Sequence, residues 1–320
     1  MKVLGLSPLD KDSTVTLVDD GVVLFAAGEE RFTRVKLQSG FPWRALQSGF
    51  DATGLGPEDI DTVVYPFFSW EEETRLFERG LSAERQYLDE SPTSRTSDAI
   101  KEALGRVPGR RGSIPGLREP NEKMDKGLAK TLAYRILASE SVVSRNVAKR
   151  SSESWGRDSS AFHRQWQEEL ESALDELGLG NRLKRVEHHR SHAANAYYRS
   201  GFDEALVVTL DGYGSGLAGS VSEGKNGRLR RLHNLDYPHS LGAFYESVTS
   251  GLGFKPSRHE GKIVGLAAYG NPDVLKQVLL DRFECQDGDI LIRAGMNRLF
   301  TRALAQRFAK RDVEIGRAHV

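Results

Sequence analysis

The sequence contains a single cysteine, Cys285, so no internal disulfide framework can form, and this composition fits a reducing compartment. Neither sign of charge is in excess, because Lys plus Arg and Asp plus Glu both number 45, and no net field favours nucleic acid or an anionic membrane. No apolar run is long enough to span a membrane, and the one after Met1 is too short for a signal peptide. We therefore expect a cytoplasmic protein with no nucleic-acid and no membrane partner.

Two segments of the chain show the same order of predicted elements. In the first, strand-like runs at 3–6, 15–18 and 22–27 are separated by a polar loop at 8–13 and by Asp19-Asp20-Gly21. An Asp-Gly pair between apolar runs is a strong hairpin signal. In the second, runs at 205–210, 217–222 and 228–235 are separated by the glycine-rich loop 211–216 and a turn at 223–227. Each segment predicts three antiparallel strands.

A repeated unit of this kind indicates two similar lobes. Actin-like and sugar-kinase-like proteins share this plan and bind nucleotide between the lobes. The predicted fold class is therefore α/β, an actin-like or sugar-kinase-like duplicated fold of the ribonuclease-H type, with an incomplete second lobe. We place the first lobe at 1–202 and the partial second lobe at 203–314.

The region between the repeats predicts a helical insert in the first lobe, at about 69–178. One more strand is expected at 61–68, helices at 69–104 and 121–178, and a loop rich in Gly and Pro at 105–119. The polar run 149–160 predicts a break in the second helical stretch. The many charges of the insert are read as a solvated face rather than a partner site.

The last six residues, 315–320, read IGRAHV. A common sequencing-adapter read, translated in one frame, encodes this string. We expect these residues to be an artefact and leave them out of the fold prediction.

Three of the eight histidines lie within the five residues 188–192. His188 and His192 are four residues apart, so on a helix they share one face and can bind one cation, whereas His189 points elsewhere. Asp211 ends a strongly apolar strand, where a carboxylate is costly unless it is paired or coordinated. Two histidines and one carboxylate suit Fe(II) and some other divalent ions, and the absence of thiolates argues against structural zinc.

Five stretches in order resemble the O-carbamoyltransferase family, which includes tobramycin, nodulation-factor and cephem carbamoyltransferases. They are AAGEERFTRVK (26–36), HHRSHAANAYYRSGF (188–202), ALVVTLDGYG (205–214), SLGAFYESVTSGLGF (240–254) and HEGKIVGLAAYG (259–270). The resemblance covers nearly the whole chain apart from the helical insert. The family's amino-terminal domain is similar to the universal tRNA threonylcarbamoyl transferase, with a duplicated actin-like fold.

The resemblance implies a two-step reaction. A carboxy-terminal YrdC-like domain, expected beyond this chain, forms carbamoyl-adenylate from carbamoyl phosphate and ATP. The amino-terminal domain then moves the carbamoyl group to a hydroxyl of a small-molecule acceptor. Aminoglycosides, lipo-oligosaccharides, cephems and polyketides are acceptor classes of the family, and the sequence does not select among them.

The resemblance also implies roles for single residues. His188, His192 and Asp211 match the family's metal ligands, usually described as iron, and a later Asp ligand is expected beyond this chain. Lys36 matches an active-site lysine that can neutralise phosphate or a developing oxyanion. The remaining matches line the nucleotide cleft: Glu260, Lys262 and Gly265.

The first polar loop departs from the family pattern of His-Asp followed by small residues. It reads Lys11-Asp12-Ser13-Thr14, so a lysine replaces the histidine. Lysine can hold phosphate but is a poor base near neutral pH unless its pKa is lowered, which puts the acid/base step or the substrate class in doubt. Lys11 and Asp12 remain catalytic candidates, and Ser13 and Thr14 are expected to donate to a phosphate.

Two other function classes stay open. A kinase or ATPase of the same fold would use Asp211 for Mg²⁺, although the histidine pair argues against that ion. A non-catalytic binding fragment would keep the fold with a partial site. We expect the isolated chain to be inactive and, with an exposed sheet edge, prone to aggregate.

Overall fold

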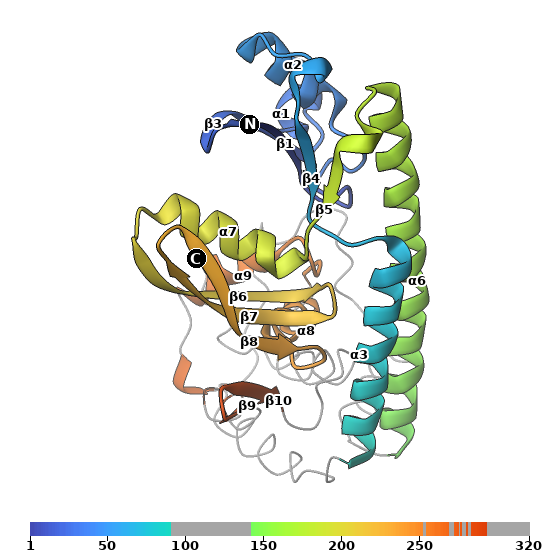
Figure 1. Cartoon of the computed structure of the whole chain (residues 1–320). Helices are drawn as coiled ribbons and strands as arrows, with labels where there is room; N and C mark the ends of the chain where they lie inside the picture. The colour runs from blue at the N-terminus through green and yellow to red at the C-terminus, as the bar shows by residue number, and fades with distance from the viewer. Residues whose placement is uncertain are drawn as a thin grey trace.

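The computed structural model describes residues 1–90, 142–251, 254–268, 272–274, 276, 280 and 283–292. The loop predicted at 105–119, Gly270 and the segment 293–320 lie outside the described residues. So does most of the predicted helical region between 91 and 141. The described part divides into a mixed sheet, an antiparallel sheet and a long pair of helices (Figure 1).

The first sheet has five strands in the order β3-β2-β1-β4-β5. Strands β3, β2 and β1 are antiparallel, whereas β4 is parallel to β1 and β5 is parallel to β4. The hairpin predicted at Asp20-Gly21 is confirmed: both residues have positive φ, and Asp19 pairs with Val22. The bounds are β1 Lys2–Leu6, β2 Thr14–Asp19, β3 Val22–Gly28, β4 Thr62–Tyr65 and β5 Leu183–Arg185.

Short helices cover this sheet and close its core. Helix α2 (Trp43–Thr53) packs on β2 and β3, and its buried Leu46 and Phe50 join the strand residues Leu4 and Leu17 in one apolar cluster. The cluster extends to Leu170 and Leu174 near the end of α6. The other short elements here are α1 Glu30–Thr33 and the 3₁₀ turns η1 Pro57–Asp59 and η2 Gly180–Arg182.

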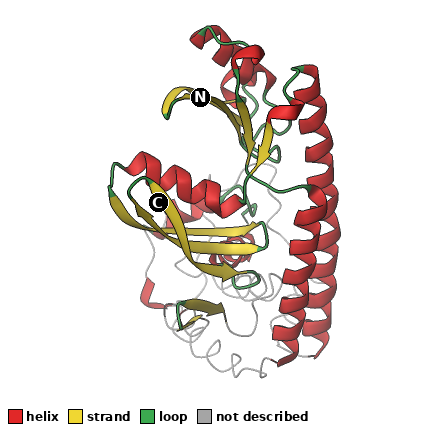
Figure 2. Ribbon diagram, in the orientation of Figure 1, coloured by secondary structure: helices red, strands yellow, loops and turns green. Residues whose placement is uncertain are grey.

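The second sheet confirms the second predicted meander. Its three antiparallel strands follow the order β6-β7-β8, with bounds Glu204–Gly214, Leu217–Lys225 and Arg228–Asp236. Helix α7 (His188–Ser200) lies across one face (Figure 2). There Ala193 and Tyr197 of the helix pack on Val207 of β6. Although the predicted boundary assigns α7 to the first lobe, the helix packs on the second sheet.

The helical insert contains two long antiparallel helices that lie side by side, α3 (Trp70–Glu90) and α6 (Val142–Glu176) (Figure 1). The break predicted at 149–160 is wrong, because α6 runs through it without interruption. Tertiary contacts outweigh the weak local preference: Lys149 and Glu153 form ion pairs with Asp89 and Arg85 of α3. Gly156 allows close packing, since a Cβ there would lie 2.7 Å from Leu81 Cδ1.

The remaining elements follow the second sheet in the chain. They are α8 Leu241–Gly251, α9 Glu260–Ala267, η3 Pro272–Val274, β9 Phe283–Gln286 and β10 Asp289–Ile292. Helix α8 contacts β6, and β9 and β10 form a separate antiparallel hairpin. The coarse prediction of an α/β fold is thus confirmed. Of the helices that the structure describes, none combines the length and apolar character needed to cross a membrane.

Candidate metal centre

The first two turns of α7 carry the two candidate histidine ligands. Glu187 caps this helix, since its carboxylate accepts hydrogen bonds from the backbone N–H of His189 at 2.6 Å and of Arg190 at 3.0 Å. Arg231 of β8 forms an ion pair with the same carboxylate. The cap and the ion pair therefore fix the start of α7 on the second sheet, and His188 and His192 project from one face as predicted.

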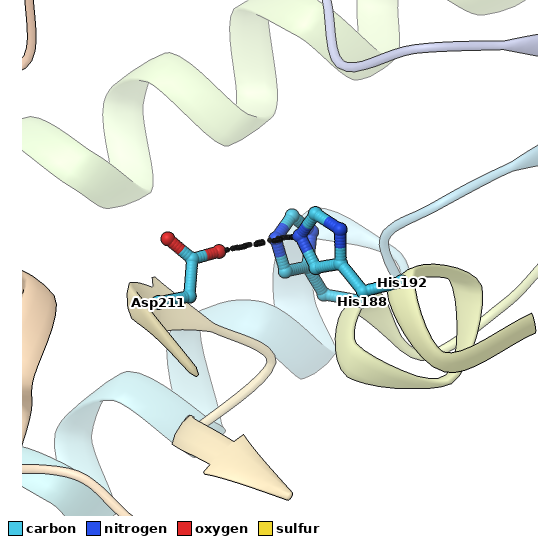
Figure 3. Close-up of side chains that lie close together, drawn as sticks. All are labelled: His188, His192 and Asp211. Atoms are coloured by element: carbon cyan, nitrogen blue, oxygen red, sulfur yellow. Dashed lines mark hydrogen bonds and ion pairs between the residues drawn. The ribbon is translucent and has the colours of Figure 1, made fainter. Parts of the chain in front are cut away.

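Asp211 of β6 meets both histidines (Figure 3). Its Oδ2 lies 2.8 Å from His188 Nε2 and 3.4 Å from His192 Nε2, and the two Nε2 atoms are 2.9 Å apart. The His188 side chain is only 10% exposed, whereas that of His192 is 50% exposed. One atom from each residue thus converges on a point that is buried on the His188 side and open on the His192 side.

The carboxylate of Asp211 brings negative charge to this cluster. Burial alone raises the pKa of the Asp211 carboxyl, but hydrogen bonds with His188 and His192 outweigh it and hold the pKa below its ordinary value. His188 Nδ1 lies 3.3 Å from the Pro66 carbonyl oxygen, which only accepts, so this contact favours the tautomer with the proton on Nδ1. A neutral His188 then presents an Nε2 lone pair to a carboxylate. A metal ion placed between this lone pair and the carboxylate would interact favourably with both.

The His188 ring is held from several sides in the way that metal-binding imidazoles usually are. Its Nδ1 lies beside a backbone carbonyl oxygen, a contact that favours a proton on Nδ1 and directs the lone pair of Nε2 toward the other two donor atoms. Phe67 stacks on the ring with centroids 4.5 Å apart. Gly214 of β6 faces the ring so closely that a Cβ would lie 2.1 Å from His188 Cδ2. The donor set and its support therefore fit a divalent cation.

His189 belongs to the fold rather than to the cluster. It is fully buried, its Nε2 lies 3.2 Å from the Leu217 carbonyl oxygen, and its Nδ1 lies 3.2 Å from Thr209 Oγ1. Burial, aided by the charge of His188, lowers its pKa to about 4. A neutral His189 with both ring nitrogens engaged ties α7 to β6 and β7.

Asp211 is positioned through its backbone. Ser240, just before α8, donates from Oγ to the Asp211 carbonyl oxygen at 2.7 Å and accepts from the Ala243 N–H at 2.9 Å. A Cβ at Gly242 would lie 2.5 Å from the Asp211 carbonyl carbon, so only glycine lets α8 approach this closely. The start of α8 therefore fixes the strand end that carries the carboxylate.

The structure brings together two groups of predicted residues that are far apart in the chain. Lys11 Nζ in the first loop donates to the Ser257 carbonyl oxygen at 3.0 Å, and the Ser257 N–H donates to Glu260 Oε1 at 2.8 Å. Lys11 and Glu260 thus share a partner next to α9. Their catalytic and nucleotide-binding roles stay predictions.

The hydroxyls of the first loop have partners inside the protein. Ser13 is fully buried and donates to the Gln38 carbonyl oxygen at 3.1 Å, while Thr14 Oγ1 donates to the Asp12 carbonyl oxygen at 2.7 Å. Asp12 itself is exposed, with φ of 52°. Phosphate binding by Ser13 or Thr14 remains a prediction that requires these hydrogen bonds to be exchanged.

The other predicted residues lie on open surface. Lys36 is exposed in the turn after α1, and Lys262 is exposed on α9. A Cβ at Gly265 would meet nothing within 4 Å. No hydrogen bond or ion pair of the described residues joins Lys36 to His188, His192 or Asp211.

Sequence reasoning missed the residues that support the candidate ligands. Gly214 stands in the quoted ALVVTLDGYG stretch and Gly242 in SLGAFYESVTSGLGF, so a glycine within each motif was the available signal. Pro66, Phe67 and Ser215 had no local signal, because their role depends on contacts with residues that are distant in the chain.

Comparison with known proteins agrees with the order of motifs. The sequence model of the family described as "Carbamoyltransferase N-terminus" matches residues 2–106 and 159–306. The uncharacterized protein sll1178 of Synechocystis is 30% identical over 287 residues, covering 87% of this chain and 37% of that protein. Nodulation protein NolNO of Sinorhizobium fredii is 25% identical over 276 residues, covering 86% of this chain and 30% of that protein.

A third relative, nodulation protein NolO of Bradyrhizobium diazoefficiens, is 34% identical over 102 residues, covering 32% of this chain and 18% of the relative. The chain thus spans less than two fifths of the length of these relatives. The family match leaves out 107–158, which includes the first half of α6. Because the match covers most of the remaining chain and contains the whole histidine–aspartate cluster, the chain belongs to the carbamoyltransferase family and corresponds to its amino-terminal domain.

Proposed function

We propose that the protein transfers a carbamoyl group from carbamoyl-adenylate to a hydroxyl of a small-molecule acceptor, with a divalent metal, Fe(II) by its donor set, at the histidine–aspartate cluster. The observation that carries this proposal is the convergence of three donor atoms within 4.8 Å of one another in a member of this family. Two imidazoles and a carboxylate with one open side are typical of sites that accept a further ligand.

The proposed reaction forms one bond and breaks one bond at the carbamoyl carbon. The acceptor oxygen forms a bond to the carbamoyl carbon, the bond from that carbon to the phosphate oxygen breaks, AMP leaves, and the hydroxyl proton passes to a base. When bound, a divalent ion would supply Lewis-acid polarisation of the carbonyl or a hold on the phosphate. His188, His192 and Asp211 are its proposed ligands.

The lysines are proposed to act on the adenylate. Lys36 and Lys11 supply positive charge for the phosphate or the developing oxyanion, and Asp12 lies beside Lys11 in the first loop. Glu260, Lys262 and Gly265 of α9, with Ser13 and Thr14, are the proposed nucleotide contacts. The hydrogen bond from Lys11 to Ser257 supports this grouping, because it joins the first loop to the start of α9.

We also propose the duplicated, actin-like form of the α/β fold. The first sheet has a meander β3-β2-β1 with β4 parallel to β1, and the second has the matching meander β8-β7-β6. An adenylate between two such lobes would be shielded from water. The adenylate itself is proposed to come from a YrdC-like domain, and the greater length of the relatives supports such a partner.

The test is metal-dependent release of AMP from supplied carbamoyl-adenylate, measured with a set of hydroxyl acceptors. His192→Ala removes one proposed ligand without touching the helix cap, so metal binding and transfer should be lost together. Arg199→Ala, an exposed change in the last turn of the same helix, should leave both unchanged. Retained transfer by the His192 variant without bound metal would refute the metal-dependent reaction.

The two other functions are separated by simple assays. ATP hydrolysis without carbamoyl phosphate would favour a kinase or ATPase, for which Asp211 would bind Mg²⁺. Absence of any transfer from supplied carbamoyl-adenylate, in a protein as long as the relatives, would favour a non-catalytic binding fragment.

A further inference from the structure

Glu73 is a buried carboxylate that the proposed reaction does not use. It lies in the first turn of α3, in the helical insert, and only 1% of its surface is exposed. Its Oε1 accepts two hydrogen bonds, from Ser215 Oγ at 2.7 Å and from the Phe68 N–H at 3.0 Å. Its Oε2 is buried without a hydrogen-bond partner in the described part of the chain. A carboxylate is costly in such a place, so its two contacts require an explanation.

Both contacts lead to His188. Ser215 Oγ, which donates to Glu73, accepts the His188 backbone N–H at 3.3 Å. Phe68 follows the two residues that orient the His188 ring, since the Pro66 carbonyl accepts from Nδ1 at 3.3 Å and Phe67 stacks at 4.5 Å. Glu73 Oε1 therefore links Ser215, which contacts the His188 backbone, to the segment 66–68, which contacts the His188 ring. Glu73 and Ser215 are 142 residues apart in the sequence.

We propose that Glu73 is a positioning residue of the metal centre, which fixes the tautomer and direction of the His188 imidazole through Ser215 and the segment 66–68. This inference rests on the proposed metal centre. It adds that the helical insert, through Glu73, helps to position a ligand of that centre. Groups that orient a metal-binding histidine are typically worth about 10–100-fold in metal affinity.

A simpler role for Glu73 is to cap α3, because the Phe68 N–H lies just before that helix. Capping alone would affect stability without changing His188. Burial raises the pKa of Glu73, and hydrogen bonds from Ser215 and the Phe68 N–H offset this only in part. A neutral amide is therefore a close substitute for this carboxyl group. Glu73→Gln keeps the oxygen that accepts the two hydrogen bonds. Glu73→Leu keeps a similar side-chain volume but has no accepting oxygen.

The experiment titrates the purified chain with Co²⁺ alone and records the visible absorption of the bound ion. Long-range ¹H–¹⁵N NMR of the metal-free protein reports the His188 tautomer. For Glu73→Leu we expect Co²⁺ affinity to fall about 10–100-fold, the spectrum to change and the Nδ1–H tautomer to be lost. Glu73→Gln should retain wild-type behaviour. Glu29→Leu is the matched control, because Glu29 is also buried and accepts two backbone N–H groups of α2, a helix that packs on β2 and β3.

The outcomes separate this inference from the metal centre itself. Unchanged affinity, spectrum and tautomer in a folded Glu73→Leu variant would overturn the positioning role while the metal centre stands. If Glu73→Leu does not fold, Ser215→Ala decides in the same way, since it removes the link to His188 and leaves the carboxylate in place. If the wild-type protein binds no Co²⁺, the metal centre is refuted, and the NMR tautomer alone then decides whether Glu73 orients His188.

Discussion

At the scale of single residues, Gly214 leaves the least room beside the metal cluster. A Cβ there would lie 2.1 Å from Cδ2 of His188, whose ring is already fixed by Pro66 and Phe67. We expect Gly214→Ala to displace the ring and to lower Co²⁺ affinity at least about tenfold, as loss of an orienting contact does. Isothermal titration calorimetry with Co²⁺ measures this.

Gly212 provides the control for that change on the same strand. A Cβ at Gly212 would meet nothing within 4 Å, so Gly212→Ala should leave affinity unchanged. Equal affinities in the two variants would show that the His188 ring can move without loss and would contradict the packing argument.

The sequence marked the three candidate ligands, whose donor atoms the structure brings together, but it did not mark the residues that support them. The spacing of His188 and His192 is a local property of a helix, and Asp211 is marked by its place after an apolar run. In contrast, the role of Ser215 depends on Glu73, and that of Pro66 on His188, through contacts that only the folded chain creates. Local patterns carry no information on such contacts.

At the scale of elements, α7 depends on its cap. Glu187 accepts two N–H groups of the first turn and forms an ion pair with Arg231 while its side chain is only 19% exposed. We expect Glu187→Ala to lower the free energy of unfolding by about 1–2 kcal/mol, as for other lost caps. Glu204→Ala breaks only an exposed pair with Lys225 and should cost less than about 1 kcal/mol. Urea denaturation measures the free energy of unfolding of both variants. A similar loss of that free energy in the two variants would contradict a special role for the cap.

Helix α6 shows why local patterns failed for one element and succeeded for another. The Asp20-Gly21 hairpin was predictable, because the turn conformation is decided by those two residues themselves. The polar run 149–160 favours a break by its own preferences, yet contacts with α3 keep it helical. Tertiary packing thus outweighed the local helix propensity in α6, because this helix packs against α3, which is distant in the sequence.

The same helix makes stability depend on pH through His163. This side chain packs edge-on against Phe67 and Trp166, and burial, with the charge of His188, lowers its pKa from 6.5 to about 4. The unfolded chain binds this proton first, so stability is fully present above pH 6.5 and falls as the pH drops to about 4, by at most about 3 kcal/mol. His163→Phe cannot take up the proton and should flatten this part of the stability profile. Equal profiles of the two proteins in urea denaturation would contradict the assignment.

At the scale of the whole molecule, β6 carries an exposed apolar row and, among the described strands, has a partner along one edge only. Leu206, Val208 and Leu210 alternate along β6 and are 67%, 52% and 54% exposed, opposite to the face that α7 covers. Among the described strands, β6 pairs only with β7, so its other edge has no partner strand in the described part of the chain. A long strand with an apolar face and a free edge is a site for association between chains.

This surface predicts concentration-dependent self-association of the isolated chain. Val208→Lys places a charge in the middle of the exposed row without entering the core, and edge charges oppose strand pairing between molecules. We expect the variant to stay monomeric to higher concentration than wild type in size-exclusion chromatography with light scattering. Val264→Lys on α9 changes a residue that is 61% exposed and lies outside this row, so it should associate as wild type does. If the Val208 variant associates at the same concentrations as wild type, other surfaces hold the molecules together. The exposed row of β6 would then not be the surface through which the chain associates.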